Sequence, residues 1–479
     1  MMKYLYVISS IFLLASLGSC SKFEELNTDP TKPTDATTSQ LILFAEKRAS
    51  DILYNTFTNN RIGMHYAQYW AGTDSKQDSR YSSSDAGSAS LWTMYSIVLP
   101  ALKEIEIINE NATNQAAAAN QNAIAGVLRV WVYHMLTDAF GNIPYTEAIS
   151  EQTLPAYDDA ATIYKDLLAK LDGYQAQLNT ANPSFATGDV LYRGDVTKWK
   201  KFANSLMLRM AMRMSNVDEA TAKPYIEKAI LGGVIESNGD NALFPYTNNA
   251  TEAFPYNNID RDPVQFVVTS TLVDYMAATS DPRLPMYART VADVYKGVPY
   301  ASGDNNASDA NNFSKPSTRV YSPNFPGIIF TASEALFLKA EAAARNITTG
   351  SASTFYNSGI RTSMEFWGVS ADSATAYIAR VPFNTTNWKN CIGTQKWLAF
   401  YMQGIQSWFE RVRLNFNKPD GTPLFIPPVA GSLDPTVSMV PSRITYPTTE
   451  NNTNRANKNA AAQAIGGDTK GTKLWWQKF

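Results

Sequence analysis

The sequence is short of histidine, charge and cysteine, and each shortage excludes a class of protein. Its two histidines, His65 and His134, are too few for a zinc site built on several histidines. Charged residues make up 18% of the chain, below the roughly 25% of typical domains. The formal net charge of −2 lacks the basic surface that a nucleic-acid partner requires. We therefore expect no histidine-based zinc site and no nucleic-acid ligand.

Aromatic and neutral polar residues take the place of charges. Phe, Trp and Tyr amount to 12% of the residues, and Asn, Ser and Thr carry much of the polarity. Aromatic faces beside neutral hydrogen-bonding groups suit an uncharged, hydroxyl-rich ligand, and they also suit peptides. Composition thus favours an oligosaccharide ligand, with a peptide as the alternative.

The first twenty residues have the pattern of a bacterial lipoprotein signal. Lys3 supplies the positive start, YLYVISSIFLLASL is apolar, and LGSC ends on Cys20. The apolar run is too short to span a bilayer, so we interpret residues 1–19 as a cleaved signal peptide. Cys20 would then carry the acyl chains that anchor the protein; an ordinary signal peptide with a chance cysteine is the alternative. Lipidation of Cys20 would leave Cys391 without a disulfide partner, so stability must come from burial.

Helical periodicity dominates the rest of the chain. Apolar residues recur every three or four positions in six segments, residues 122–144, 158–178, 195–215, 331–346, 351–368 and 394–413. Asp195 has the place of an N-cap, and Thr331 with Glu334 has the spacing of a capping box. Alternating strand patterns are scarce. We therefore predict a mostly α fold, in which tetratricopeptide-like helix pairs form a scaffold.

Long irregular tracts separate these helices, at residues 71–90, 236–263, 296–328 and 415–472. Loops of this length are uncommon unless they have a function, and binding residues often lie on loops held by a rigid scaffold. Aromatic and amide residues in or beside these tracts are therefore the candidate ligand-binding residues: Tyr69, Trp70, Tyr81, Tyr246, Asn248, Asn249, Phe254 and Tyr256. Packing of these rings onto the body is the alternative.

Two charged clusters have a structural interpretation as well as a functional one. Glu334 and Glu341 are seven residues apart, as in a carboxylate pair for acid–base catalysis, but the capping box and Arg345 at i+4 favour structural roles. The group Glu410, Arg411 and Arg413 favours an ion-pair network at a helix end over a site for an acidic ligand. GxSxG, HExxH and P-loop motifs are absent. We predict no catalytic residue, no cofactor and no metal.

The whole chain resembles the SusD/RagB family of nutrient-binding lipoproteins, in particular its SusD-like second branch. The segments that carry the resemblance stand in the family's order: CSKFEELNTDPTKPT, RVWVYHMLTDAFGNIPYTEAI, YRGDVTKWKKFANSLMLRMAMRMS, FTASEALFLKAEAAAR, TQKWLAFYMQGIQSWFERVR, VPSRITYP and KLWWQKF. The stretch SKFEELN after Cys20 is also similar to the signal that sends Bacteroidetes lipoproteins to the outer face of the outer membrane.

The resemblance implies an architecture, a location and a partner. It implies a signal peptide over residues 1–19, a lipidated tether over 20–40, and one domain over 41–479, made of a scaffold and a loop-rich binding lobe. The partner would be a SusC-like TonB-dependent transporter in the outer membrane, with the protein facing the cell exterior. Only the lipid attachment at Cys20 carries over by position.

We therefore expect a non-enzymatic surface protein that captures oligosaccharides for import. A peptide-binding member of the same import system is the first alternative. A surface glycoside hydrolase and a helical scaffold that only bridges proteins are the other two.

Overall fold

The computed structural model describes residues 36–73, 76–150, 152–257, 266–302 and 310–479. Cys20 and the predicted signal peptide lie outside the described residues. The first described helix, α3 (Thr38–Tyr54), begins inside the segment predicted as a tether, behind a capping box formed by Thr37 and Gln40. None of the helices in the described part of the chain is long and apolar enough to cross a membrane.

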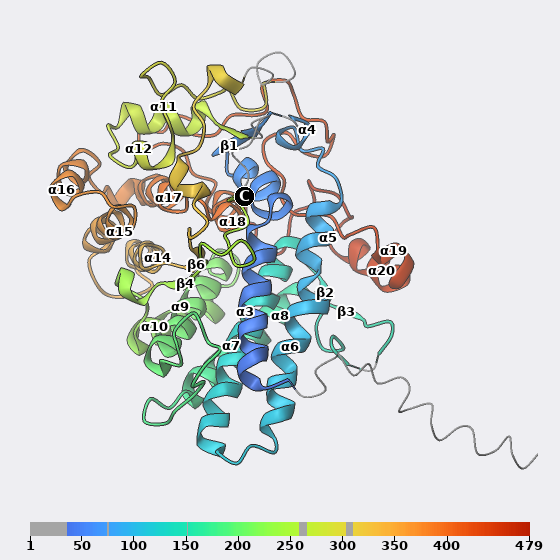
Figure 1. Ribbon diagram of the computed structural model, residues 1–479. Helices are drawn as coiled ribbons and strands as arrows, with labels where there is room; N and C mark the ends of the chain where they lie inside the picture. Colours follow the sequence, from blue (N-terminus) through green and yellow to red (C-terminus); the bar gives the residue numbers. More distant parts are fainter. Residues whose placement is uncertain (1–35, 74–75, 151, 258–265, 303–309) are drawn as a thin grey trace, which may run out of the picture.

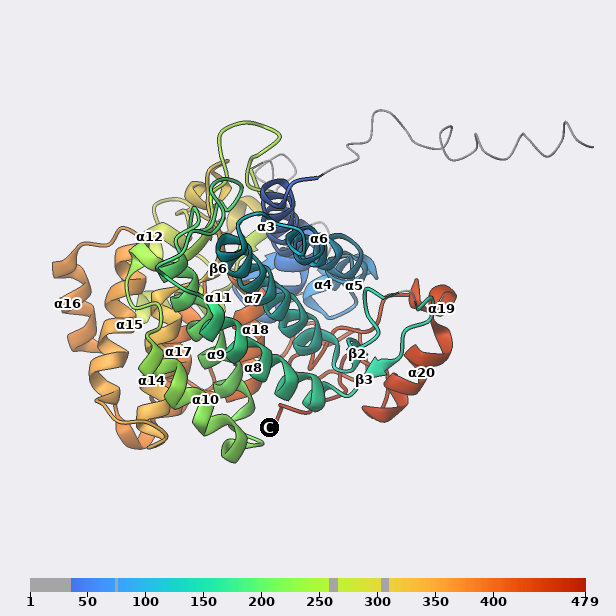
Figure 2. The ribbon, with the colours of Figure 1, turned by 90° about the horizontal axis from the view of Figure 1, so that it is seen from below.

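The body consists of long helices that pack against one another largely in chain order (Figures 1 and 2). The first row contains α3, α6 (Met94–Asn109), α7 (Gln115–Phe140), α8 (Ala160–Gln177), α9 (Val196–Met214) and α10 (Glu219–Gly232). A second group contains α14 (Ala332–Ala344), α15 (Ala352–Phe366), α16 (Ala371–Arg380), α17 (Trp388–Ala399) and α18 (Gly404–Leu414). The two groups meet where α14 packs on α9. The mostly helical fold is thus confirmed.

Capping residues set the limits of the helices that the periodicity predicted. Asp195 accepts hydrogen bonds from the backbone N–H groups of Thr197 and Lys198 and so starts α9 as predicted. α7 ends before Gly141, whose φ of +88° lies outside the helical region. Five of the six predicted segments contain one helix each, namely α7, α8, α9, α14 and α15.

The sixth prediction, one helix over residues 394–413, is wrong. The chain leaves the helix after Ala399, passes Met402 at φ +72°, and begins α18 at Gly404. A Cβ on Gly404 would lie 2.4 Å from the backbone of Gly63, which belongs to the π-helix η2 (Thr56–Met64). The break therefore lets α18 start directly against η2, a contact that local periodicity does not encode.

The predicted capping box at α14 is only half present. The Thr331 hydroxyl caps the backbone N–H of Glu334 at 3.4 Å. The Glu334 carboxylate instead pairs with Arg209 of α9, with an Nε–Oε1 distance of 2.6 Å, and both side chains are buried. The Arg209 guanidinium is buried, so water cannot replace a missing carboxylate partner, and the Glu334 side chain forms this ion pair instead of closing the capping box.

The predicted ion-pair network at the end of α18 is confirmed for Glu410 and Arg413. Arg413 Nη2 lies 2.7 Å from Glu410 and 2.5 Å from Glu341, and all three side chains are buried. Arg411 takes a different role, because its guanidinium donates to the backbone carbonyls of Tyr66 and Met439. The network joins α14 to α18 through the interior.

The β-strands in the described part of the chain are short and form only two-stranded sheets. Three antiparallel pairs occur, between β1 (Trp70–Gly72) and β5 (Phe266–Val268), β2 (Ile143–Pro144) and β3 (Tyr157–Asp158), and β4 (Ala242–Phe244) and β6 (Gly327–Phe330). Each pair links segments that lie apart in the sequence. The first pair places the chain that enters α11 (Ser270–Ala278) beside the segment after η2.

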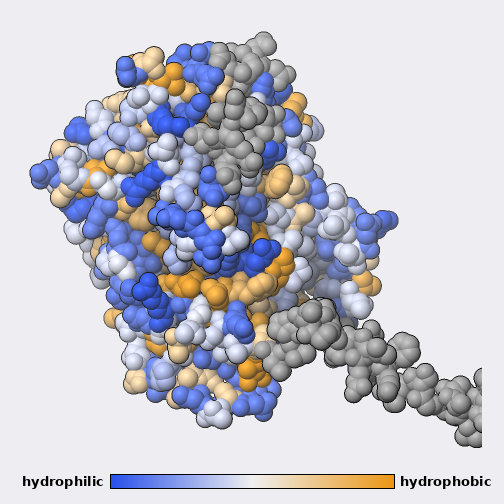
Figure 3. Space-filling model, in the orientation of Figure 1, coloured by the Kyte–Doolittle hydropathy of each residue, from blue (hydrophilic) through white to orange (hydrophobic). Residues whose placement is uncertain are grey.

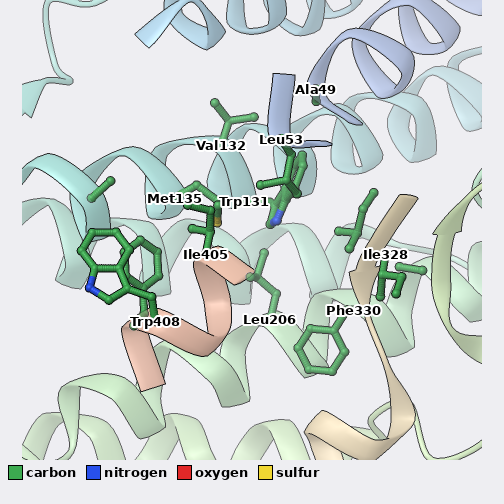
Figure 4. Close-up of a cluster of buried hydrophobic side chains, with 14 of the residues drawn as sticks. Ala49, Leu53, Trp131, Val132, Met135, Leu206, Ile328, Phe330, Ile405 and Trp408 are labelled. Carbon is green, nitrogen blue, oxygen red and sulfur yellow. The ribbon is translucent and has the colours of Figure 1, made fainter. Parts of the chain in front are cut away.

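The core draws on helices from both groups (Figure 4). Its labelled side chains come from α3, α7, α9, β6 and α18: Ala49, Leu53, Trp131, Val132, Met135, Leu206, Ile328, Phe330, Ile405 and Trp408. The surface is mixed, but an apolar band crosses the middle of the face shown in Figure 3, where α3 lies in Figure 1. On α3, Leu43 is 40% and Phe44 46% exposed.

Candidate functional site

A pocket of about 710 Å³ lies between α11, the end of α16 and the loop 415–426. Figure 1 shows α11 and α16 at the upper left of the molecule. We call it the α11 pocket. Its polar lining residues are Ser270, Thr271, Asp274, Thr279, Arg380, Asn384, Asn387, Lys418 and Asp420. The volume is within the range of small-molecule sites.

The buried side chain of Gln68 joins two walls of the α11 pocket. Its amide donates to the carbonyl of Ile426 at 2.6 Å, and its Oε1 accepts from the Thr271 hydroxyl at 3.0 Å and from the Ile426 N–H at 3.3 Å. Thr271 and Ile426 both line the pocket. Thr269, the N-cap of α11, also donates its hydroxyl to the Gln68 carbonyl. Gln68 thus fixes α11 relative to the loop.

Side chains that bind backbone carbonyls hold the rim of the α11 pocket. Arg380 Nη2 donates to the carbonyl of Ser280 at 2.9 Å, which joins the ends of α16 and α11. Asn387 Nδ2 donates to the carbonyl of Pro419 at 2.6 Å. Because these donors are occupied by the protein, they position the rim rather than the ligand.

The pocket wall nearest the core is apolar and aromatic. Tyr275 and Tyr356 are both buried, and the Tyr356 hydroxyl donates to the Val381 carbonyl at 3.1 Å. Cys391 lies here as a free, buried thiol, and burial raises its pKa. A raised pKa keeps the thiol neutral and unreactive.

The charged groups of the α11 pocket balance one another. Asp274 and Asp420 face Lys418 and Arg380, two negative charges against two positive charges. Burial raises the pKa of Asp274, and the charge of Lys418 only partly opposes this effect. No salt bridge to Asp274 forms among the described residues. Its carboxylate is therefore partly desolvated and available to accept hydrogen bonds from a ligand.

The carboxylates of the α11 pocket are poorly arranged for acid–base catalysis. The pKa of Asp420 is lowered because its carboxylate accepts hydrogen bonds from the side chain and backbone of Thr422, as in an ordinary turn. Asp274 and Asp420 thus differ in pKa as an acid–base pair would, but the Asp420 carboxylate is already engaged by its own loop. In the described ranges no group of three His, Cys, Asp or Glu side chains could hold a metal ion.

The six aromatic residues predicted to bind ligand lie in the core instead. Tyr69, Trp70, Tyr81, Tyr246, Phe254 and Tyr256 are each at most 4% exposed. Their polar atoms bind the protein: the Trp70 indole donates to the Tyr401 hydroxyl at 2.9 Å, for example. In this conformation none of the six presents a ring face to a ligand. The large apolar area of an aromatic ring favours burial wherever a loop can fold back on the body.

Three of these rings pack behind the α11 pocket or contact one another in the core. Tyr69 stacks on Trp397 at 5.2 Å, and Trp397 contacts Tyr275, which lines the pocket. The ring of Trp70 lies 6.0 Å from that of Tyr256, so predicted residues from two distant segments meet inside the protein. The sequence analysis selected the segment with Tyr69 and Trp70 as ligand-binding. It did not select Gln68, the residue before them, because Gln68 belongs to no motif.

Asn248 and Asn249 are the two predicted residues that remain exposed. The Asn249 side chain accepts hydrogen bonds from Thr251 within its own loop. Neither lines the α11 pocket. Their role in binding stays a prediction.

The chain matches a known protein family over most of its length. The model of the SusD-like_2 family, described as starch-binding and associating with the outer membrane, matches residues 30–447. Among curated proteins none matches the sequence.

Solved structures share the fold along nearly the whole chain. A chitin-binding protein is 30% identical, with a TM-score of 0.82, over 92% of this chain and 100% of its own. A SusD-like protein from Bacteroides thetaiotaomicron is 26% identical, with a TM-score of 0.78, over 92% and 99%. A chitin-binding SusD homolog from Flavobacterium johnsoniae has 24% identity and a TM-score of 0.79 over 91% and 98%, and supports the fold alone.

Proposed function

This chain belongs to the SusD-like family, and from that premise we propose that it captures oligosaccharides in the α11 pocket without cleaving them. The observation that carries the proposal is the pocket itself, which has a volume of about 710 Å³ and balanced charges. A carbohydrate offers hydroxyl and amide groups and no net charge, so a neutral pocket with hydrogen-bonding side chains suits it.

The first ligand to try is a chitin oligosaccharide. The 30% identical relative is named a chitin-binding protein, whereas the family description names starch. The amide N–H and hydroxyl groups of N-acetylated sugars can donate to the free carboxylate of Asp274. Chitin and starch fragments are therefore the two ligands to compare.

Calorimetry on the purified protein with both fragments tests the proposal. We expect saturable binding that changes little with salt, because the pocket has no net charge, and no release of reducing ends. Released reducing ends would support a glycoside hydrolase instead. Absence of saturable binding to both fragments would support a helical scaffold that only bridges proteins.

Two neighbouring alanines of α11 provide a matched pair of variants. Both are exposed, but Ala278 lines the pocket and Ala277 does not. Ala278→Trp should fill the pocket and abolish binding, and Ala277→Trp should leave binding unchanged. Equal effects of the two variants would place the ligand elsewhere.

We also infer a lipid anchor at Cys20 and a SusC-like transporter as partner. The family description names association with the outer membrane. The exposed Leu43 and Phe44 lie on the first described helix, close to where the tether joins the body, and exposed apolar patches often mark interaction sites.

Fractionation of cells tests the anchor. Cys20→Ala should release the protein from the membrane fraction, because the acyl chains can no longer be attached. Cys391→Ala is the control and should remain bound to the membrane. If Cys20→Ala also remains bound, the anchor lies elsewhere. Substitution of Leu43 and Phe44 by serine should reduce co-purification of a transporter in mild detergent.

A further inference from the structure

A second pocket, of about 150 Å³, lies between α6, α7 and α8. We call it the tyrosine pocket. It shares no lining residue with the α11 pocket, and Figure 1 shows its helices in the lower part of the molecule, away from α11. The volume corresponds to about five water molecules in the liquid, so it suits one small group rather than an oligosaccharide.

Every charge on the wall of the tyrosine pocket is positive. Lys103 of α6, Arg129 of α7 and Lys170 of α8 line it. Glu106 lies 2.5 Å from Arg129 and 3.2 Å from Lys103, and Asp166 lies 2.8 Å from Lys170, but neither carboxylate is a lining residue. The two carboxylates thus pair with all three cations, and Asp166 also accepts a hydrogen bond from the Tyr145 hydroxyl, so the pocket and its partners keep one net positive charge.

Three tyrosines complete the wall. The Tyr174 hydroxyl accepts a hydrogen bond from Arg129 at 2.9 Å, which leaves its own proton available for a ligand. The ring of Tyr145 packs edge-on against Tyr133 at 4.8 Å and lies 4.7 Å below the Lys170 ammonium. The Tyr133 hydroxyl has no hydrogen-bond partner among the described residues. The wall is therefore rich in donors.

The backbone beside the tyrosine pocket is strained. Ile149 lines the pocket with φ at +55°, a left-handed conformation that a β-branched residue rarely adopts. Its side chain is 38% exposed, although it is large and apolar. Strain of this kind persists where the surrounding structure fixes it, often at binding sites.

We propose that the tyrosine pocket binds the anionic group of a small ligand, a carboxylate or a phosphate. Two ammonium groups, one guanidinium and two phenol hydroxyls converge on a space that fits one such group, and the lining residues include no carboxylate. Charge-assisted hydrogen bonds from these donors are the strong ones available to an anion. The source is an acidic sugar or a sugar phosphate. The proposal does not depend on the function of the α11 pocket.

Calorimetry at low salt with glucuronate, inorganic phosphate and neutral glucose tests the proposal. We expect one saturable site for glucuronate, phosphate or both, weakened by added salt, and no competition from chitin fragments. Binding of glucuronate alone indicates an acidic sugar, and binding of phosphate indicates a sugar phosphate. Absence of saturable binding to both anions would overturn the proposal, as would equal binding of glucose.

Rim lysines allow variants that keep the fold. Lys103 and Lys170 are about half exposed, at 46% and 49%, so the double variant Lys103→Gln, Lys170→Gln should fold. It should bind the anion about tenfold more weakly, because two partly exposed charge contacts are lost. Lys165→Gln on α8, outside the pocket and 54% exposed, is the matched control and should bind normally. Equal effects of the control and the double variant would overturn the site.

A third variant tests the tyrosine wall without changing charge. Tyr133→Phe removes only the unpartnered hydroxyl, so its stability should stay close to that of the original protein. We expect weaker anion binding and unchanged binding of chitin fragments. Unchanged anion binding would show that the Tyr133 hydroxyl does not contact the anion. If the double lysine variant nevertheless binds the anion weakly, the cations alone make the contact.

Discussion

Asp274 and Gln68 determine different properties of the α11 pocket. Asp274 offers a partly desolvated carboxylate to the ligand, and Gln68 fixes the two walls between which the ligand would lie. Ligand contact and wall position can therefore be tested by separate substitutions.

Asp274→Asn should weaken binding of the glycan about tenfold, because a hydrogen bond to a charged group contributes roughly 1.5–3 kcal/mol. Burial raises the pKa of Asp274, so it takes up a proton at a higher pH than an ordinary aspartate does. Since the ionised form accepts the hydrogen bond, affinity should fall as the pH is lowered from neutral to about 4, and the fall should begin above the pH at which an ordinary aspartate takes up its proton. Calorimetry at both pH values checks this.

The matched control for Asp274 is Asp172→Asn on α8, which lies outside the α11 pocket and should bind normally. Asp274→Asn itself should show a flat pH profile. An affinity of the unaltered protein that does not change over this pH range would contradict the role of Asp274.

Gln68→Leu should lower both stability and affinity. It removes three hydrogen bonds inside the protein and leaves Thr271 and Ile426 without their partner, which should cost roughly 1–3 kcal/mol of unfolding free energy. The walls of the pocket would then move apart, so glycan affinity should fall too. Urea unfolding and calorimetry measure the two effects. Gln121→Leu, with one bond to Ser184, should affect stability alone.

At the scale of single residues, the sequence did not predict which side chains are buried and which hold the pocket together. Aromatic side chains in loops either pack or bind, and composition does not distinguish the two outcomes, so six predicted rings proved to be buried. Gln68 has no periodicity or motif, and its importance depends on contacts with residues far along the chain. The segment HYAQYW nevertheless contains both Gln68 and two of the predicted rings, Tyr69 and Trp70.

At the scale of elements, capped amphipathic helices were predictable and interrupted ones were not. α9 begins after Asp195 because the cap and the first turn are neighbours in sequence. The gap between α17 and α18 depends on η2, whose backbone meets the start of α18 at Gly63 and Gly404. A contact between distant segments leaves no local pattern, so the sequence predicted one helix.

Gly404→Ala should destabilise the protein by roughly 1–3 kcal/mol or more, because the added methyl would lie 2.4 Å from the backbone of Gly63 and neither backbone can easily move. Gly173→Ala on α8 is the matched control. No atom lies within 4 Å of its added methyl, so it should be neutral or stabilise by up to about 1 kcal/mol. Thermal unfolding of both variants measures this. Equal stability of the two would mean that η2 and α18 do not touch as described.

At the scale of the whole molecule, the family and its mostly helical fold were predictable because long segments in a fixed order carried the resemblance. The position of the pocket was not, since it forms where α11, α16 and the loop 415–426 meet. Buried charges also join helices at this scale. Glu341 of α14 and Glu410 of α18 share Arg413, and Lys396 of α17 also pairs with Glu410.

Glu341→Gln should lower the free energy of unfolding at neutral pH by about 3 kcal/mol, because it breaks a buried, two-pronged ion pair with Arg413. Burial raises the pKa of Glu341, but the attraction and hydrogen bonds of Arg413 outweigh it, so the pKa is lowered from the ordinary 4.5. A carboxyl with a lowered pKa in the folded state stabilises the fold above its unfolded value. That stabilisation is lost as the pH falls through the folded value.

The unaltered protein should therefore lose stability between neutral pH and acid, and Glu341→Gln should lose less over the same range. Urea unfolding at a series of pH values measures both slopes. Glu227→Gln is the matched control, because Glu227 pairs with Lys223 on the surface with 51% of its side chain exposed, and its loss should change stability by less than about 0.5 kcal/mol. Identical slopes for the unaltered protein and Glu341→Gln would show that protonation of other carboxylates causes the acid unfolding. The pKa of Glu410 is also lowered, so Glu410 would be the next residue to substitute.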